Sequence, residues 1–219
     1  MILAVDVGNS NIVLGCMDGL TVRRTIRLKT DRAMSAAGYT VTLQAALAQA
    51  GFSVAGFEGG ILSSVVAAVT EPLRQALSAL IPGPVPVVGE TVKTTIPLCI
   101  DQPETIGADL IAAAEGALAQ YTPPLVLIDM GTATTVTVVD QQRRYIGGAI
   151  LAGVRLGVQA LFSGTAQLPS VSIQAPKQAI CGTALESIQS GAVFGAAAMM
   201  DGLAERFEAE LGKKCTLLA

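Results

Sequence analysis

The chain has 219 residues, of which 51% are hydrophobic and 14% are charged, and its formal net charge is −3 at pH 7. This composition supplies enough apolar side chains for one large or two small domains and excludes extensive disorder. The absence of histidine excludes Ser–His–Asp and Cys–His catalysis and removes the commonest zinc ligand. Lys and Arg never run longer than a pair, so the sequence indicates no nucleic-acid partner.

The N-terminus and the apolar runs bear on the cellular compartment. A strand-like run follows the first Met directly, without the basic region or cleavage site of a signal peptide. No apolar run reaches the roughly 18 residues that a transmembrane helix needs. We therefore expect a cytoplasmic protein with no membrane partner. Four widely spaced cysteines are interpreted as buried reduced thiols: Cys16, Cys99, Cys181 and Cys215.

The first half of the chain predicts an antiparallel meander followed by helices. Turn signals and β-branched runs predict strands, and apolar residues at helical spacing predict helices. The helix over 71–80 would have Pro72 near its first position. In chain order we expect strands at 2–7, 11–16 and 21–28, a helix at 40–50, a strand at 60–66, a helix at 71–80 and a short strand at 85–88.

The second half repeats this pattern. A long predicted helix near its end is apolar nearly all round, which indicates burial or an interface. The repeat predicts a duplicated α/β architecture of two closely packed subdomains, 1–119 and 120–219, with a cleft between them. The expected elements are a helix at 107–119, strands at 125–129, 134–139 and 144–149, helices at 153–161 and 186–207, and a strand at 215–219.

One motif occurs twice. Residues 2–14 read ILAVDVGNSNIVL and residues 125–139 read LVLIDMGTATTVTVV, so each apolar run ends in Asp-x-Gly followed by small polar residues. Glycine lets the backbone turn close to a ligand, and successive N–H groups and hydroxyls bind anions. Asp6 would repel phosphate directly, so we expect it to hold Mg²⁺ through water. A single copy would be read as a strand-to-turn signal; two copies predict phosphate binding.

The segment PETIGAD (103–109) supplies a third candidate. Asp109, in the first turn of a predicted helix, is either a helix-stabilising carboxylate or a general base for a substrate hydroxyl. The two phosphate motifs on the same chain favour the base. Gly147, Gly148 and Gly153 permit either a close approach to a ligand or a bulge and a packed turn.

Seven blocks of the chain resemble type III pantothenate kinases. They occur in the family's order and span nearly the whole sequence, and IDMGTATT with GGAI and GTAxLP is a highly specific combination. The blocks are DVGNSN (6–11), SSVV (63–66), PETIGAD (103–109), IDMGTATTV (128–136), GGAILAG (147–153), GTAQLP (164–169) and GTALESIQSG (182–191).

The resemblance implies a duplicated ribonuclease H-like fold of the actin and sugar kinase superfamily. It also implies ATP-dependent phosphorylation of pantothenate to 4'-phosphopantothenate, the first step of coenzyme A synthesis, by a homodimer. ATP would be bound by Thr132 and by Asp6, Val7, Gly8, Asn9, Ser10, Asn11, Ile12 and Val13.

The resemblance also assigns the catalytic base, the cation site and the second substrate. Asp109 would deprotonate pantothenate, and Asp129 would bind a monovalent cation, K⁺ or NH₄⁺. The pantothenate pocket would be formed by Gly107, Ala108, Asp109, Leu110 and Ile100, with Thr183 contributed by the neighbouring subunit.

Several positions depart from the family's pattern. Leu110 replaces an Arg that would pair with the pantothenate carboxylate, Ile100 replaces a pocket Tyr, and Ala152 replaces Pro. The sequence ends before the Thr-Gly-Gly turn that helps hold adenosine, so either the C-terminal subdomain is truncated or nucleotide binding is weakened. These departures leave two alternatives open: a catalytically weak, nucleotide-binding relative with a regulatory role, or a kinase of another small hydroxylated substrate.

Overall fold

A computed structural model describes residues 1–165 and 168–219. Its backbone contacts divide the chain into two compact units. The first, called the N-terminal unit here, comprises Met1–Thr95 and Glu104–Glu115, and the second, the C-terminal unit, comprises Ile96–Pro103 and Gly116–Ala219. The single boundary expected at residues 119–120 stays a prediction.

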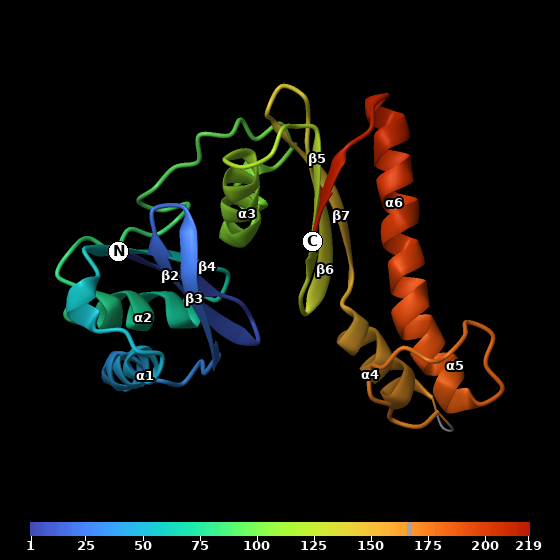
Figure 1. Cartoon of the computed structure of the whole chain (residues 1–219), viewed down its shortest axis with the longest axis horizontal. Helices are drawn as coiled ribbons and strands as arrows, with labels where there is room; N and C mark the ends of the chain where they lie inside the picture. The colour runs from blue at the N-terminus through green and yellow to red at the C-terminus, as the bar shows by residue number, and fades with distance from the viewer. Residues whose placement is uncertain (166–167) are drawn as a thin grey trace. The chain divides into compact units, whose positions relative to one another are not determined.

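The N-terminal unit is a four-stranded sheet with two helices packed on it (Figure 1). The strand order is β3-β2-β1-β4; β1 pairs antiparallel with β2 and parallel with β4. Residues 84–88 continue the sheet beyond β4 through parallel hydrogen bonds. The elements are β1 (Ile2–Val7), β2 (Asn11–Asp18), β3 (Thr21–Lys29), α1 (Ala36–Gln49), the 3₁₀ turn η1 (Val54–Gly56), β4 (Gly59–Ser64) and α2 (Ala67–Leu80).

Alternation of side chains along the strands explains the core of this unit. Every second residue of β1 and β2 is buried, as expected for a sheet covered by helices on one face. Apolar residues of both helices pack against that face of the sheet. The largest fully buried core residues include Leu3, Val7, Ile12, Leu14, Tyr39, Leu43, Leu47, Leu73 and Leu77.

The C-terminal unit repeats the same topology. Its strand order is β7-β6-β5-β8, with antiparallel pairs within the meander and a parallel β5–β8 pair. Helix α6 packs along this sheet (Figure 1). The elements are β5 (Leu125–Met130), β6 (Ala133–Val139), β7 (Tyr145–Ala152), α4 (Val154–Gly164), α5 (Ala184–Ser190), the π-helical turn η3 (Gly191–Gly195), α6 (Ala196–Leu211) and β8 (Thr216–Leu218).

The repeat of one strand order in both units confirms the predicted duplicated ribonuclease H-like α/β fold. Two further elements, η2 (Pro103–Thr105) and α3 (Ala108–Leu118), lie where the chain passes between the units. Eight of the nine expected strands are observed within three residues of their predicted ends, and the ninth, residues 85–88, forms only isolated bridges.

The helix boundaries correct three predictions. Helix α1 begins four residues early, because Ser35 accepts a hydrogen bond from the Gly38 N–H at its N-cap. Helix α2 begins at Ala67, which places Pro72 inside the helix rather than near its first position. The valines before Ala67 continue the strand pattern and conceal the true start. The predicted single helix 186–207 is α5, η3 and α6, with a π turn at Gly191–Gly195.

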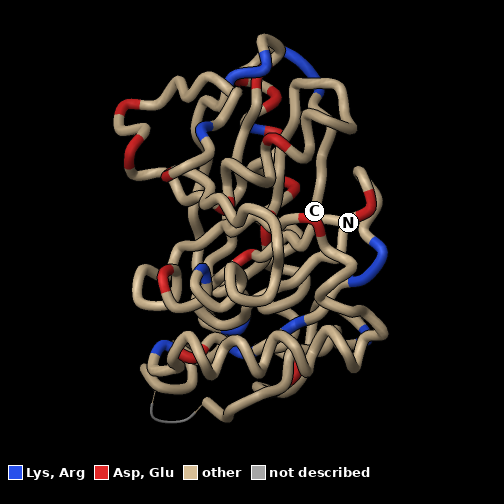
Figure 2. The backbone as a smooth tube through the Cα atoms, turned by 90° about the vertical axis from the view of Figure 1, so that its left-hand side faces the viewer, with Lys and Arg blue, Asp and Glu red and all other residues tan. Residues whose placement is uncertain are grey.

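Charged residues are distributed along the whole backbone in short runs (Figure 2). Among the helices in residues 1–165 and 168–219, none combines the length and the hydropathy that a membrane span requires. Cys16 is buried, but Cys99 is exposed and Cys181 and Cys215 are half-buried, so the prediction of four buried thiols was wrong for three of them. The three lie in loops, where the neighbouring apolar residues do not bury them fully.

Candidate active site

The first Asp-x-Gly motif forms a closed loop between β1 and β2. Asp6 is exposed near the end of β1, and the Gly8 N–H donates to the Asn11 carbonyl at 2.9 Å. Val7 and Ile12 are fully buried, so they can offer a ligand only their backbone. The exposed side chains of the loop are therefore polar, as a phosphate site requires.

A segment that the sequence analysis did not identify runs along this loop. Thr30 donates its hydroxyl to the Gly8 carbonyl at 2.7 Å and its N–H to the Ser10 carbonyl at 3.1 Å. Arg32 donates from its guanidinium to Asn9 Oδ1 at 2.8 Å. We call residues 30–32 the strap. Pairing of Asn11 with Lys29 across β2 and β3 brings the strap beside the loop.

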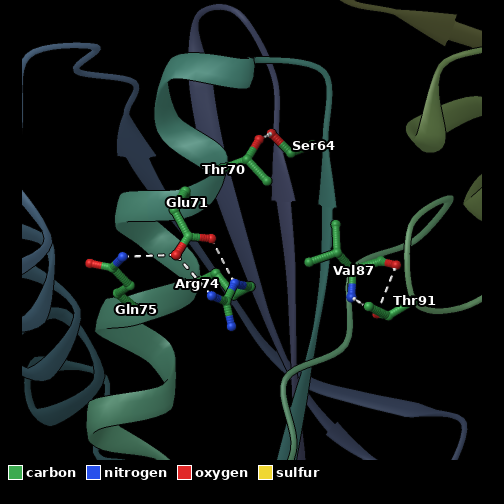
Figure 3. A network of polar contacts seen from close by, with 7 residues as sticks. All are labelled: Ser64, Thr70, Glu71, Arg74, Gln75, Val87 and Thr91. Carbon is green, nitrogen blue, oxygen red and sulfur yellow. Dashed lines mark hydrogen bonds and ion pairs between the residues drawn. The ribbon is translucent and has the colours of Figure 1, made fainter.

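The SSVV block supports the same loop from β4. Ser63 lies opposite Asp6 and donates its hydroxyl to Asp6 Oδ1 at 3.0 Å. Ser64 Oγ accepts the Val66 N–H at 3.2 Å and the Thr70 hydroxyl at 2.8 Å, which joins the end of β4 to α2. Figure 3 shows the Ser64–Thr70 contact. Ser63 thus orients the Asp6 carboxylate, and Ser64 fixes the strand end beneath it.

Further polar contacts in Figure 3 stabilise the same region. Glu71 accepts two hydrogen bonds from Arg74, at 2.8 Å each, and one from Gln75. The Arg74 hydrogen bonds and charge hold the pKa of Glu71 below its usual value. Thr91 accepts the Val87 N–H at 2.7 Å and closes the turn after the last bridge of the sheet. These contacts are structural and do not reach the loop.

Asp109 lies in the same unit as the first loop. It is the second residue of α3, is half-buried, and accepts the N–H of Leu110 at 2.8 Å. A side chain at Gly107 would collide with the Asp109 carboxylate and would meet the Val65 side chain at 3.4 Å. The Val65 N–H donates to the Val7 carbonyl at 3.1 Å. The carboxylate therefore lies near Val65, whose backbone is tied to the start of the phosphate loop.

The second Asp-x-Gly motif forms a turn between β5 and β6. The Gly131 N–H donates to the Ala133 carbonyl, and the Gly153 N–H donates to the Thr132 carbonyl, both at 3.0 Å. A Cβ at position 153 would collide with the carbonyl oxygens of Gly131 and Thr132. Gly153 is thus required because α4 begins directly against the turn, which favours the packed-turn interpretation of this glycine.

Asp129 has a second oxygen beside it. It pairs with Thr135 across β5 and β6, so the two side chains are on the same face. Thr135 Oγ1 is buried. Among the buried side-chain nitrogen and oxygen atoms in the described part of the chain, it alone has no hydrogen-bond partner. A buried hydroxyl without a partner is costly unless a ligand completes it.

An apolar cavity of about 650 Å³ lies in the C-terminal unit. Met130, Gly153 and Ala184 line it, so it extends from the second loop to the start of α5. The neighbouring Thr183 caps α5: its hydroxyl accepts the Glu186 N–H at 3.2 Å and contacts Glu186 Oε2 at 3.0 Å. The cavity walls offer apolar contact and few polar groups.

The structure thus groups the predicted residues into two sets. The N-terminal unit contains residues 6–13 and 107–110, and the C-terminal unit contains Ile100, Asp129, Thr132 and Thr183. Ile100 is half-buried and would lie 3.7 Å from a Cβ at Gly147. In residues 1–165 and 168–219 no three Cys, Asp or Glu side chains converge on a metal position. Two residues of the GTAQLP block, Ala166 and Gln167, lie outside the described residues.

A sequence model of the family described as type III pantothenate kinase matches residues 2–206. The chain belongs to the type III pantothenate kinase family. A type III pantothenate kinase of Exiguobacterium sibiricum is 39% identical over 213 residues, which are 97% of this chain and 84% of that protein. One from Moorella thermoacetica is 32% identical over 219 residues, which are 100% of this chain and 86% of that protein.

A solved structure shows the same fold as this type III pantothenate kinase family member. It is a conserved putative Baf family transcriptional activator from Campylobacter jejuni, with a TM-score of 0.52 and 18% identity. The alignment covers 92% of this chain and 79% of that one. At this identity the likeness concerns the fold alone.

Proposed function

We propose that this chain transfers the γ-phosphoryl group of ATP to the hydroxyl of pantothenate, giving 4'-phosphopantothenate for coenzyme A synthesis. The family match carries the assignment of the reaction. The observation in the structure that supports it is the position of Asp109 near Val65, whose N–H donates to the carbonyl of Val7 at the start of the first phosphate loop.

Asp109 acts as the general base. Its carboxylate accepts the proton of the pantothenate hydroxyl while that oxygen attacks the γ-phosphorus of ATP. The new oxygen–phosphorus bond forms as the bond between the γ-phosphorus and the bridging oxygen breaks, and ADP leaves. Gly107 is needed for this role, because a side chain there would displace the Asp109 carboxylate.

Residues of both loops bind ATP. In the first loop, residues 6–13 form the ATP site, and the exposed, uncharged polar side chains there are those of Asn9, Ser10 and Asn11. In the second loop Thr132 contacts ATP. Asp6, which Ser63 orients, fits a Mg²⁺ ion held through water. When bound, Mg²⁺ neutralises charge on the phosphate oxygens.

The residues near Asp129 fit a monovalent cation. The Asp129 carboxylate and the buried Thr135 hydroxyl are hard oxygen ligands on one face of the sheet. Such ligands suit K⁺ or NH₄⁺ better than a soft metal ion. A bound cation would also complete the coordination that Thr135 Oγ1 lacks.

The residues assigned to pantothenate binding are 107–110 and Ile100, with Thr183 contributed by a second subunit. The Thr183 hydroxyl already hydrogen-bonds the backbone N–H and the carboxylate of Glu186, so it would meet pantothenate only by exchanging or sharing those contacts. A homodimer is supported by large apolar side chains of α5, η3 and α6 that are exposed in the single chain: Leu185, Phe194 and Met199. The requirement for ATP supports a cytoplasmic location.

An ADP-release assay with and without pantothenate tests the function. We expect pantothenate-dependent ADP release that falls by a factor of about 10² to 10⁴ in Asp109→Asn. Asp101→Asn is the matched control, since it removes an exposed acid from the preceding segment. ADP release that does not require pantothenate, or that survives in Asp109→Asn, would refute the proposal.

A further inference from the structure

The strap binds the oxygen acceptors of the first loop. Thr30 hydrogen-bonds the carbonyl oxygens of Gly8 and Ser10, and Arg32 hydrogen-bonds the side-chain oxygen of Asn9. These three oxygens carry partial negative charge and would repel a phosphate if they faced it. With the oxygens satisfied by the strap, the loop can direct N–H groups toward an anion.

Arg32 fixes the orientation of the Asn9 side chain. A guanidinium only donates hydrogen bonds, so the Asn9 atom facing it at 2.8 Å must be the oxygen. The amide nitrogen of Asn9, with its two N–H groups, then points away from Arg32. A free asparagine would sample both orientations, and in one of them its oxygen would oppose a phosphate.

The strap is itself held by the core. Tyr39 of α1 is 1% exposed, and its hydroxyl donates to the Asp31 carbonyl at 2.6 Å. Asp31 also accepts the Ala33 N–H at 2.9 Å, which closes the turn that follows. The backbone is therefore held on both sides of Arg32: the Thr30 and Tyr39 contacts precede it, and the Ala33 N–H that donates to Asp31 follows it. This rigidity lowers the entropy cost of keeping an exposed Arg in one geometry.

We propose that Arg32 is a positioning residue of the nucleotide site: it locks Asn9 with its amide N–H groups available to the ATP phosphates. This proposal rests on the proposed ATP-binding role of the first loop. Arg32 acts through Asn9 rather than by its charge alone. Removing either side chain should therefore cost the same interaction, and removing both should cost little more.

A double-mutant cycle on the 219-residue chain tests this inference. We would measure the dissociation constant of Mg-ATP by calorimetry for the wild type, Arg32→Ala, Asn9→Ala and the double variant. One charge-assisted hydrogen bond predicts about tenfold weaker binding in each single variant. The double variant should also bind about tenfold more weakly, rather than a hundredfold. Arg32→Lys, which retains a donor and the charge, should lose only about threefold.

Arg24→Ala is the matched control. This variant also removes one positive charge, but from β3. Arg24 pairs with Cys16, at the end of β2 that lies away from the first loop. We expect its ATP affinity and the melting temperatures of all these exposed-site variants to match those of the wild type. A double variant that binds Mg-ATP about a hundredfold more weakly, as two independent effects would give, would overturn the proposal. Equal losses of ATP affinity in Arg32→Ala and Arg24→Ala would overturn it too. A wild type that binds ATP but does not phosphorylate pantothenate would refute the proposed function alone.

Discussion

Asp140 gives the most quantitative stability prediction. It is 4% exposed and closes the β6–β7 hairpin: Oδ1 accepts the N–H groups of Gln142 and Arg144, both at 2.9 Å. Oδ2 accepts Arg144 Nε at 2.7 Å and forms an ion pair with the same guanidinium. Asp140→Asn keeps the Oδ1 acceptor but places an amide N–H₂ against the Arg144 guanidinium.

The magnitude follows from the interactions lost. A hydrogen bond to a charged group contributes about 1.5–3 kcal/mol, and breaking a fully buried ion pair costs about 3–5 kcal/mol. The Arg144 side chain is 46% exposed, so water can solvate it after the change. We therefore expect a loss of about 2 kcal/mol in the free energy of unfolding, or a melting temperature lower by roughly 4–8 °C.

The assay is thermal unfolding followed by circular dichroism. The matched control is Asp18→Asn in the corresponding β2–β3 hairpin, because the Asp18–Arg23 pair is more than half exposed on both sides. We expect no measurable change there. An Asp140→Asn variant that melts with the wild type, or an Asp18→Asn variant that loses as much, would refute the reasoning.

The pH dependence of this difference has a definite sign. Burial by itself would raise the pKa of Asp140, but the hydrogen bonds and charge of Arg144 outweigh it and hold the pKa below the ordinary 3.8. A carboxyl with a lowered folded-state pKa stabilises the fold fully above its unfolded pKa and loses this contribution as the pH falls through its folded pKa. The melting difference should thus be full at pH 7 and shrink below about pH 3.8.

Three further substitutions probe the strap, the cation site and the substrate pocket. Tyr39→Phe removes the hydrogen bond to the Asp31 carbonyl and should lower the free energy of unfolding by about 1 kcal/mol. It should also weaken ATP binding, and an unchanged ATP affinity would show that the strap does not need this contact. Thr135→Val should raise the K⁺ concentration that gives half-maximal activity about tenfold, without lowering the melting temperature. An unchanged K⁺ dependence would show that Thr135 is not a ligand of the cation. Leu110→Arg should lower the KM for pantothenate about tenfold at similar kcat, and a higher KM would show that the pocket has no place for the guanidinium.

The strands and loops that carry the site were predictable because their signals are local. An apolar run ending in Asp-x-Gly specifies a strand and the turn after it, and both copies fold that way. The helix starts were less accessible. Ser35 and Ala67 begin helices among residues that also fit a turn or a strand, and the packing against the sheet decides between them.

The strap could not be read from the sequence in the same way. Arg32 and Asn9 are 23 residues apart and meet only through the register of the β2–β3 hairpin. A bulge between Cys16 and Met17 shifts that register by one residue, so a simple hairpin would have placed Lys29 opposite Ser10. The role of Thr135 could not be predicted for a related reason, because only the structure shows that its hydroxyl is buried without a hydrogen-bond partner.

The most direct measurement is mass spectrometry of the acceptor after incubation of the full chain with ATP, Mg²⁺, K⁺ and pantothenate. We predict pantothenate heavier by one phosphoryl group, in an amount equal to the ADP formed, and at least about a hundredfold less product in the same time with Asp109→Asn. ADP that accumulates while pantothenate keeps its mass would contradict the account.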